Sequence, residues 1–552
     1  MITRHLSCAC KGNRLRIQLH GSGVEFMRHK RSVLYSFLLL ISLLFFSPIA
    51  AFSQSGVLHP HWAPRTWQLR PDDITTVMGF RAKLAGNLNV ADHPTAAVIN
   101  NAFIRGFMTE DDVMTWEVNA PDEAVYNVSL LYTGNKKLLA QSTLEVASGS
   151  TTITEKTNVP NWNTRPTVQR HTLKQALPLK KGINQVSFRL ADFQGTQADR
   201  EALENTPNAR GNPTPFALWS IEFVQPEALA AIKNRAKAMK ADVQWMVDGK
   251  YGLFVHFSSG STPFHGGPRL GDQYQKLVGQ FDVDAFVAAV VETGASWVCF
   301  TCAHGTQHWP GPSKTIDHIK PGFTCERDLI RDLIDGLAKH DIRLMLYYNP
   351  NSGLDDLYGP TYGKGESPDP TGYFNFLESL FREMSLRYGE DLATTAGYVD
   401  SCGWKLYQHD PPWEKFAAAI KAGNPNAPVG FSQNLFANLT PFSDLVVSDG
   451  AGREPEILPA VLFEEGGQLE GQYPANWCYM DGWSSRVRNG TFTAPPRFSA
   501  EQYIEFFKKA DEADMPITIN LSMTPDVSAD HPFFNPVCIE IMKQVRQAVK
   551  GY

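Results

Sequence analysis

The pattern of apolar and polar positions divides the chain into two regions. Residues 54–225 contain short runs in which apolar and polar residues alternate, and such runs predict half-buried β-strands. The clearest are AVYNVSLLYTG (124–134), INQVSFRL (183–190) and ALWSIEFV (217–224). Since no long amphipathic helix interrupts them, the region predicts a β-sandwich. Its order of segments resembles the jelly-roll modules that bind carbohydrate, and a purely structural packing domain is the equal alternative.

The rhythm changes at residue 249, where short apolar runs begin to alternate with amphipathic helical segments. The strand candidates are 251–257, 296–302, 343–349, 396–401, 428–434, 444–449, 476–480 and 516–522. Helical patterns lie at 283–294, 327–340, 371–389, 412–423, 501–514 and 536–549, and none is convincing after the fifth and sixth strands. Eight such units predict a (β/α)8 barrel over residues 249–552. A doubly wound sheet is the alternative, but no glycine-rich dinucleotide loop follows the first strand.

The remaining segments complete the domain plan. Residues 226–248 have helical composition and are interpreted as a connector. Residues 27–53 begin with basic residues, continue with an apolar run over 33–46 and end in small residues, which is typical of a secretory signal peptide. An uncleaved anchor is the alternative, although about 14 apolar residues are few for a membrane span. Residues 1–26 resemble neither, so we interpret Met27 as the start of translation and residues 1–26 as a misplaced-start leader.

Charge and cysteine content exclude several classes of protein. Residues 1–53 hold seven basic residues and one acidic residue, so their removal changes the net charge from −6 to −12. A charge of that sign argues against nucleic acid or an anionic membrane as partner. We expect a secreted or periplasmic protein without stable membrane insertion. The six cysteines after residue 53 form neither a disulfide framework nor a zinc-site spacing, so we expect buried thiols, no metal and no cofactor.

The barrel hypothesis places catalytic groups at the carboxyl ends of the strands. The polar and aromatic residues there include His256, His304, Tyr347, Tyr348, Asp400, Gln433, Asn434, Asp449, Trp477 and Asn520. Such a set suits a sugar, because hydroxyls need hydrogen-bonding partners and ring faces need aromatic side chains. Glycoside hydrolysis also needs two carboxyl groups across the scissile bond. Asp400 directly follows its strand and is the candidate nucleophile, and its partner is sought among Asp449, Glu454 and Glu456.

Six segments, in order, resemble those of the α-L-fucosidases of glycoside hydrolase family 29. They are KYGLFVHF (250–257), VCFTCAHGTQHW (298–309), ERDLIRDLIDGLAKHDIRLMLYY (326–348), GYVDSCGW (397–404), SDGAGREPEILP (448–459) and INLSMTPD (519–526). The resemblance covers nearly the whole predicted barrel. It implies an exo-acting, retaining hydrolase that releases a terminal α-L-sugar from a glycan through a covalent glycosyl-aspartyl intermediate, and the signal-peptide pattern adds secretion.

The resemblance also implies roles for individual residues. Asp400 would be the nucleophile, and Glu456 or, by a shift of two residues, Glu454 would be the acid/base. His256 and His304 would contact sugar hydroxyls, with Tyr347 or Tyr348 lining the pocket. Tyr398 stands where the family often has a tryptophan. Asn434 and Trp477 complete the predicted substrate-binding set, and for Trp477 a core position is equally expected.

Several departures from the family pattern affect residues that would recognise the sugar more than residues that would cleave the glycosidic bond. The Glu-Trp-Tyr motif after the first strand is missing, and no arginine stands in GFSQNLF (430–436). The usual pair of histidines is reduced to His304, for which His308 is the compensating candidate. A metal pair formed by His304 and His308 is disfavoured because no HExxH glutamate accompanies them. The alternatives are therefore a glycosidase for a related sugar such as α-L-galactose, or a catalytically silent carbohydrate-binding protein.

Overall fold

The structure is a computed structural model of the 552-residue chain. It describes residues 64–90, 103–134, 140, 142–157, 169–192, 216–257, 271–303, 307–350, 357, 371–391, 394–399, 410–431, 438–449, 457–464, 467, 469–482, 487–488, 491–492, 494–523 and 533–552. All of them belong to one compact unit, residues 60–552. Within these ranges no helix combines the length and the apolar character needed to cross a bilayer.

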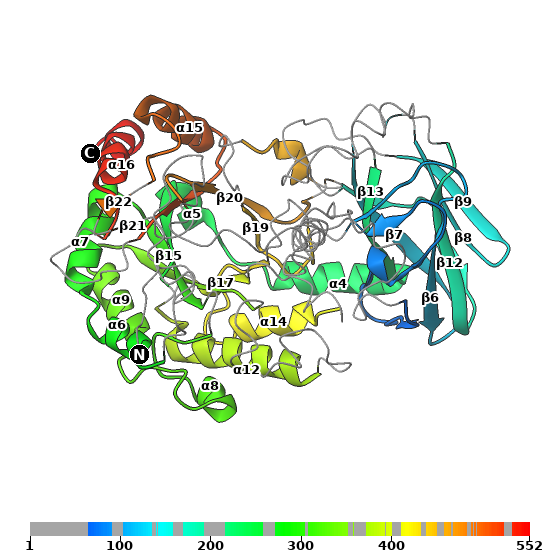
Figure 1. The fold of residues 1–552 in the computed structure, drawn as a ribbon, viewed down its shortest axis with the longest axis horizontal. Coiled ribbons are helices and arrows are strands. Elements are labelled where there is room, and N and C mark those ends of the chain that lie inside the picture. The colour runs from blue at the N-terminus through cyan, green and yellow to red at the C-terminus, as the bar shows by residue number, and fades with distance from the viewer. Residues whose placement is uncertain are drawn as a thin grey trace, which may run out of the picture. The chain divides into compact units, whose positions relative to one another are not determined.

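Two sheets form the first region (Figure 1). The first has the order β1 (Trp67–Gln68), β6 (Met114–Ala120), β12 (Gly182–Leu190), β8 (Thr143–Ser148) and β9 (Thr151–Lys156), with β3 (Lys83–Leu84) beside β6. The second has the order β10 (Gln169–Thr172), β7 (Ala124–Gly134), β13 (Phe216–Val224), β5 (Ile104–Arg105) and β4 (Asn89–Val90), with β11 (Leu177–Leu179) beside β7 and β2 (Thr75–Met78) beside β13. Among the paired strands of these two sheets, only β1 and β6 run parallel.

The inner faces of the two sheets pack against each other, as the alternating pattern predicts. Along β6 every second residue is buried. The Trp116 indole on β6 donates a hydrogen bond to the carbonyl of Met78 in the second sheet, over 3.1 Å. Phe188 on β12 stacks on Phe216 of β13, with ring centroids 5.9 Å apart. These contacts join the inner faces of the two sheets.

Strand β13 differs from the expectation of a half-buried strand, because all nine of its residues are buried. Its polar residue Glu222 accepts two hydrogen bonds from Arg170 on β10, at 3.0 and 2.9 Å. Arg170 also donates to the carbonyl of Asn438, which belongs to the second region, over 2.6 Å. The outer face of β13 is therefore covered, and paired charges replace solvent there.

The second region holds one sheet of eight parallel strands. Its order is β18 (Gly430–Phe431), β17 (Thr394–Val399), β16 (Arg343–Tyr348), β15 (Trp297–Ala303), β14 (Tyr251–Val255), β23 (Ile517–Leu521), β20 (Tyr473–Tyr479) and β19 (Leu445–Asp449). All eight predicted strands are confirmed. The end strands β18 and β19 approach each other at their starts, where the Leu445 amide donates to the Val429 carbonyl over 3.1 Å.

Helices separate most of these strands and lie outside them in Figure 1. The predicted helices are confirmed as α7 (Val283–Thr293), α9 (Leu329–Ala338), α12 (Thr371–Tyr388), α14 (Trp413–Ile420), α15 (Ala500–Glu512) and α16 (Pro536–Lys550). The connector is two helices, α4 (Pro226–Ala238) and α5 (Gln244–Gly249). The short helices α6 (Gly271–Gly279) and α8 (Lys314–Ile319) were not predicted. Residues 438–444, the part of the connection before β19 that the structure describes, contain no helix.

Large side chains pack together on one face of the parallel sheet. Because side chains alternate between the two faces of a strand, one interior layer takes every second residue. Phe254, Trp297, Met345, Tyr347 and Trp477 belong to this interior cluster, each at most 6% exposed. Gly252 is required by the packing, since a Cβ atom there would lie 2.4 Å from the Trp297 ring. The glycine of the KYGLFVHF segment therefore makes room for an interior indole.

An ion pair between half-buried Arg70 and buried Asp410 links the two regions and gives a pH prediction. The carboxylate of Asp410, just before α14, lies 2.8 Å from the guanidinium of Arg70. Burial raises the pKa of Asp410 to about 7, although the positive charge of Arg70 acts to lower it. Since this pKa lies above the unfolded value of 3.8, the contribution of Asp410 to the free energy of unfolding falls as pH rises from about 4 to 7. In the Asp410→Asn variant we expect a smaller difference between urea midpoints at pH 5 and pH 8 than in the wild type. An unchanged difference would contradict the assignment.

Candidate active site

Three of the predicted substrate residues gather around one interior ring at the carboxyl ends of the parallel strands. The ring of Phe254 on β14 lies 4.2 Å from His256, 5.0 Å from Tyr347 and 4.2 Å from Trp477, measured between centroids. His256 and Trp477 are each 5.8 Å from Tyr347. Each of these residues comes from or directly follows a different strand, β14, β16 or β20. The structure therefore brings together residues that are about 220 positions apart in the sequence.

Strand periodicity explains why these side chains converge. His256 is two residues after Phe254, and Tyr347 is two residues after Met345, so each shares the interior face of its strand. The Nδ1 atom of His256 forms a 3.2 Å hydrogen bond with the hydroxyl of buried Thr301 on β15. Thr301 was missed by the sequence reasoning. Its place two residues after Cys299, which belongs to the interior cluster, could have identified it in the sequence. Its hydrogen bond fixes the orientation of the His256 imidazole.

Two other predicted residues lie apart from this cluster. Tyr348 faces the opposite side of β16, where its hydroxyl donates to Gln307 over 2.6 Å and its ring packs against Phe381 of α12. Burial raises the pKa of the Tyr348 phenol. His308 stacks on Phe323 with centroids 4.3 Å apart, and both His308 and Tyr348 are buried. Of the two adjacent tyrosines, the structure places Tyr347 with His256 and Tyr348 in the layer between the sheet and α12.

The candidate catalytic carboxylates lie outside the described residues. These are Asp400, Glu454 and Glu456, and the same holds for His304 and Asn434. For Tyr398 the structure describes the backbone, which pairs with Tyr347 on one side and Gly430 on the other. Since β17 ends at Val399, Asp400 is the next residue along the chain after the carboxyl end of that strand.

Asp481 is a buried carboxylate at this end of the sheet that the sequence reasoning missed. It stands two residues after β20 and accepts hydrogen bonds from the amides of Gly482 and Ser522, both at 2.9 Å. Asn520 on β23 donates to the carbonyl of Gly482. Burial raises the pKa of Asp481, while the backbone donors act in the opposite direction. Asp481 and Asn520 thus tie the end of β20, the strand that carries Trp477, to the end of β23.

Metal and thiol chemistry find no support among the described residues. No group of three or more histidine, cysteine or acidic side chains within them is placed to hold a metal ion. The cysteines that the structure describes, Cys299, Cys302, Cys325, Cys478 and Cys538, are buried and form no disulfide with one another. Burial raises the pKa of the Cys299 and Cys302 thiols, so both stay protonated and unreactive near neutral pH.

Comparison with known proteins gives distant structural similarities. No protein-family model matches the chain, and no curated protein matches it. The chain is similar to α-L-fucosidase AlfC from Lactobacillus casei in complex with its α-L-fucose product, at 14% identity over 56% of this chain and 98% of that chain, with a TM-score of 0.39. It is also similar to α-L-fucosidase isoenzyme 1 from Paenibacillus thiaminolyticus, at 16% identity over 56% and 75%, with a TM-score of 0.40. Scores at this level assign neither a family nor an activity to the chain.

Proposed function

We propose that the chain is a secreted, exo-acting, retaining glycoside hydrolase that acts on a terminal α-L-fucoside or a closely related α-L-sugar. The observation that carries the proposal is the cluster of His256, Tyr347 and Trp477 at the carboxyl ends of the parallel strands. Asp400, the candidate nucleophile, follows a strand of the same sheet. The proposal includes closure of the eight strands into a (β/α)8 barrel, and export directed by residues 27–53.

In the proposed mechanism, a carboxylate oxygen of Asp400 attacks the anomeric carbon while the glycosidic bond breaks. Glu456, or Glu454, gives its proton to the departing oxygen and so becomes the base for the second step. That carboxylate then takes a proton from water, whose oxygen replaces Asp400 on the anomeric carbon and releases the sugar with its original configuration. The imidazole of His256 and the aromatic rings of Tyr347 and Trp477 supply a hydrogen-bonding group and apolar faces for the sugar.

The departures from the family pattern favour two alternatives, and one set of assays separates all three. A hydrolase for α-L-fucosides should release nitrophenol from 4-nitrophenyl α-L-fucoside faster than from the α-L-galactoside, because its pocket would favour the sugar's methyl group. The reverse ranking indicates the related sugar. Saturable glycan binding without release from any aryl glycoside in a broad panel would leave a carbohydrate-binding protein and overturn the enzyme proposal.

Leaving-group dependence should identify the acid/base. Glu456→Ala and Glu454→Ala are compared on 4-nitrophenyl α-L-fucoside and on a fucosyl disaccharide. Nitrophenol needs little protonation, so the variant that lacks the true acid should lose far more activity on the disaccharide, by roughly 10²-fold or more. The other variant should lose similar, small factors on both substrates. If both variants lose equal factors on both substrates, neither glutamate is the acid.

A further inference from the structure

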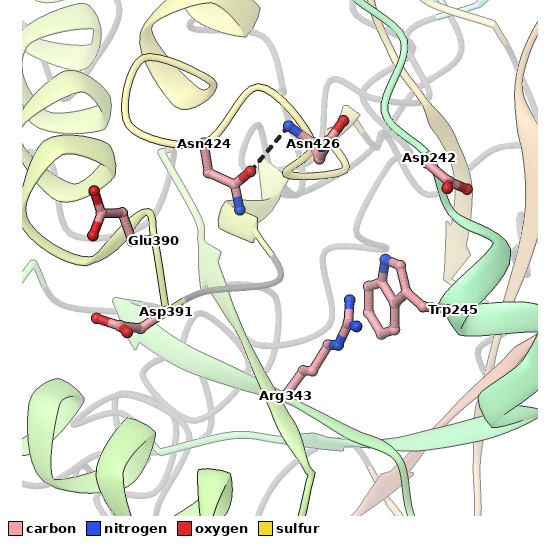
Figure 2. A pocket seen from close by; sticks show the side chains of 7 residues that line it. All are labelled: Asp242, Trp245, Arg343, Glu390, Asp391, Asn424 and Asn426. Carbon is pink, nitrogen blue, oxygen red and sulfur yellow. Dashed lines mark hydrogen bonds between the residues drawn. The ribbon is translucent and has the colours of Figure 1, made fainter.

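A cavity opens at the amino ends of the parallel strands, away from the candidate active site. Its volume is about 480 Å³, within the range of small-ligand sites. The lining residues are Asp242, Trp245, Arg343, Glu390, Asp391, Asn424 and Asn426 (Figure 2). Arg343 is the first residue of β16, and the others precede β14, β17 or β18 in the sequence. Because all strands of the sheet are parallel, this cavity and the cluster around Phe254 lie at opposite ends of it.

The central side chains of the cavity are held in place by packing and hydrogen bonds. Trp245 on α5 meets the fully buried ring of Trp297 edge to face, with centroids 5.7 Å apart. The Arg343 guanidinium lies over the Trp245 ring, 4.5 Å from its centroid. Figure 2 shows the Asn424 carboxamide across the cavity from this pair. Its oxygen accepts a 3.0 Å hydrogen bond from the backbone N–H of Asn426, which orients the NH₂ group of the carboxamide.

The acidic lining residues are solvated or already engaged. Asp391 forms a 2.6 Å ion pair with Arg331. Asp242 accepts a 2.9 Å hydrogen bond from the backbone N–H of Gln244. Figure 2 shows the carboxylates of Glu390 and Asp391 turned away from Arg343. The cavity therefore combines one cation, amide donors and the carboxylate of Asp242 beside an aromatic ring, and the two remaining carboxylates add negative charge to the lining.

This combination selects among ligand chemistries. A carboxylate or phosphate ligand only accepts hydrogen bonds and would face three negative charges besides Arg343. An ammonium ligand would be attracted by the net negative charge of the lining, but it only donates and so could not accept a hydrogen bond from Arg343 or Asn424. A hydroxyl group both donates and accepts, so a ring carrying several hydroxyls matches both kinds of lining group without an unpaired charge. The apolar face of such a ring also suits the indole edge and the aliphatic part of Arg343.

We propose that this cavity is a second, non-catalytic binding site for a neutral pyranose unit of a glycan. Arg343 and Asn424 donate to ring hydroxyls, Asp242 accepts from them, and Trp245 forms the apolar wall. The site requires no residue of the candidate active site. A glycan bound there would leave the candidate active site, at the opposite end of the sheet, free to bind substrate.

The test measures binding to the full mature chain by isothermal titration and by saturation-transfer NMR. The neutral probes are methyl α-L-fucopyranoside, methyl β-D-galactopyranoside and methyl β-D-glucopyranoside, and the charged probes are methyl β-D-glucuronide and D-glucosamine. The variants are Arg343→Ala and Asn424→Ala, and the matched control is Arg382→Ala, an exposed helical arginine that does not line the cavity. Every protein is also assayed for release of nitrophenol from 4-nitrophenyl α-L-fucoside.

We expect at least one neutral probe to bind saturably and its Kd to rise about tenfold or more in both cavity variants, as expected for loss of a charged or amide hydrogen bond. Arg382→Ala should bind like the wild type, and aryl-fucoside turnover should be the same in all four proteins. Equal neutral-probe affinity in Arg343→Ala and Arg382→Ala would overturn the proposal. So would tighter binding of the glucuronide or of D-glucosamine than of every neutral probe. If the chain is not a hydrolase, only the nitrophenol assay would show it. The binding measurements would still test the proposed sugar site.

Discussion

Replacing Asp400 with glycine should lower kcat on 4-nitrophenyl α-L-fucoside by about 10³-fold or more, comparable with the loss of other covalent nucleophiles. The expected cause is loss of the carboxylate that forms the glycosyl-enzyme bond. Added azide should restore part of the rate, because a small anion can occupy the space left by the side chain and attack the anomeric carbon. The product is then a glycosyl azide, identified by mass spectrometry and NMR.

A matched aspartate-to-glycine change separates this effect from general damage to the fold. Asp514 is exposed, precedes β23 at the opposite end of the sheet and has a positive φ of 50°, a conformation that glycine adopts without strain. Asp514→Gly should therefore keep wild-type kcat and show no azide effect. Wild-type activity in Asp400→Gly would remove Asp400 from the mechanism, and low activity without azide rescue would argue for a role other than nucleophile.

Replacing Lys421 with methionine should lower the free energy of unfolding by about 3 kcal/mol or more, because it leaves a buried carboxylate without its cation. The Lys421 ammonium donates to Asp444 over 2.7 Å and to the Ala427 carbonyl over 2.9 Å, and both charged side chains are at most 6% exposed. Asp444 also accepts the amides of Val429 and Ala241, at 2.8 and 3.2 Å. The pair therefore joins α14 and the connector to the starts of β18 and β19. Urea denaturation followed by tryptophan fluorescence measures the loss.

Two further variants test the cause of that loss. Glu414→Gln removes a partner from the exposed ion pair between Arg235 and Glu414, and should cost less than about 1 kcal/mol. Lys421→Met combined with Asp444→Asn removes both charges and should recover part of the stability lost in the single variant. If Lys421→Met alone lies within about 1 kcal/mol of the wild type, the ion pair does not hold these elements together.

The parallel strands were predictable because burial on both faces leaves a direct mark in the sequence. A strand such as YGLFV, covered on each side, reads as a continuous apolar run bounded by turn residues, and the same reasoning found all eight strands. The long helices were found from their 3.6-residue period. Helices α6 and α8 were missed because nine and six residues are too few for that period to stand out.

The candidate site was predicted in part, and the limits were set by contacts between distant segments. Strand ends identified His256, Tyr347 and Trp477, which lie together. The sequence could not choose between Tyr347 and Tyr348, because adjacent residues face opposite sides and the choice depends on which side is enclosed. The burial of Glu222 depends on Arg170, 52 positions away, and local pattern carries no information about such a partner.

The interior cluster of Phe254, Trp297, Met345, Tyr347 and Trp477 separates the two ends of the parallel sheet with close-packed side chains. No solute can diffuse through such packing, so a sugar at one end cannot reach the other without leaving the protein. Occupancy of the two ends should then be thermodynamically independent, with a coupling free energy near zero, unless binding shifts the strands themselves. A glycan held at the amino end would raise the local concentration of substrate by tethering, while the intrinsic affinity of the carboxyl end stays the same.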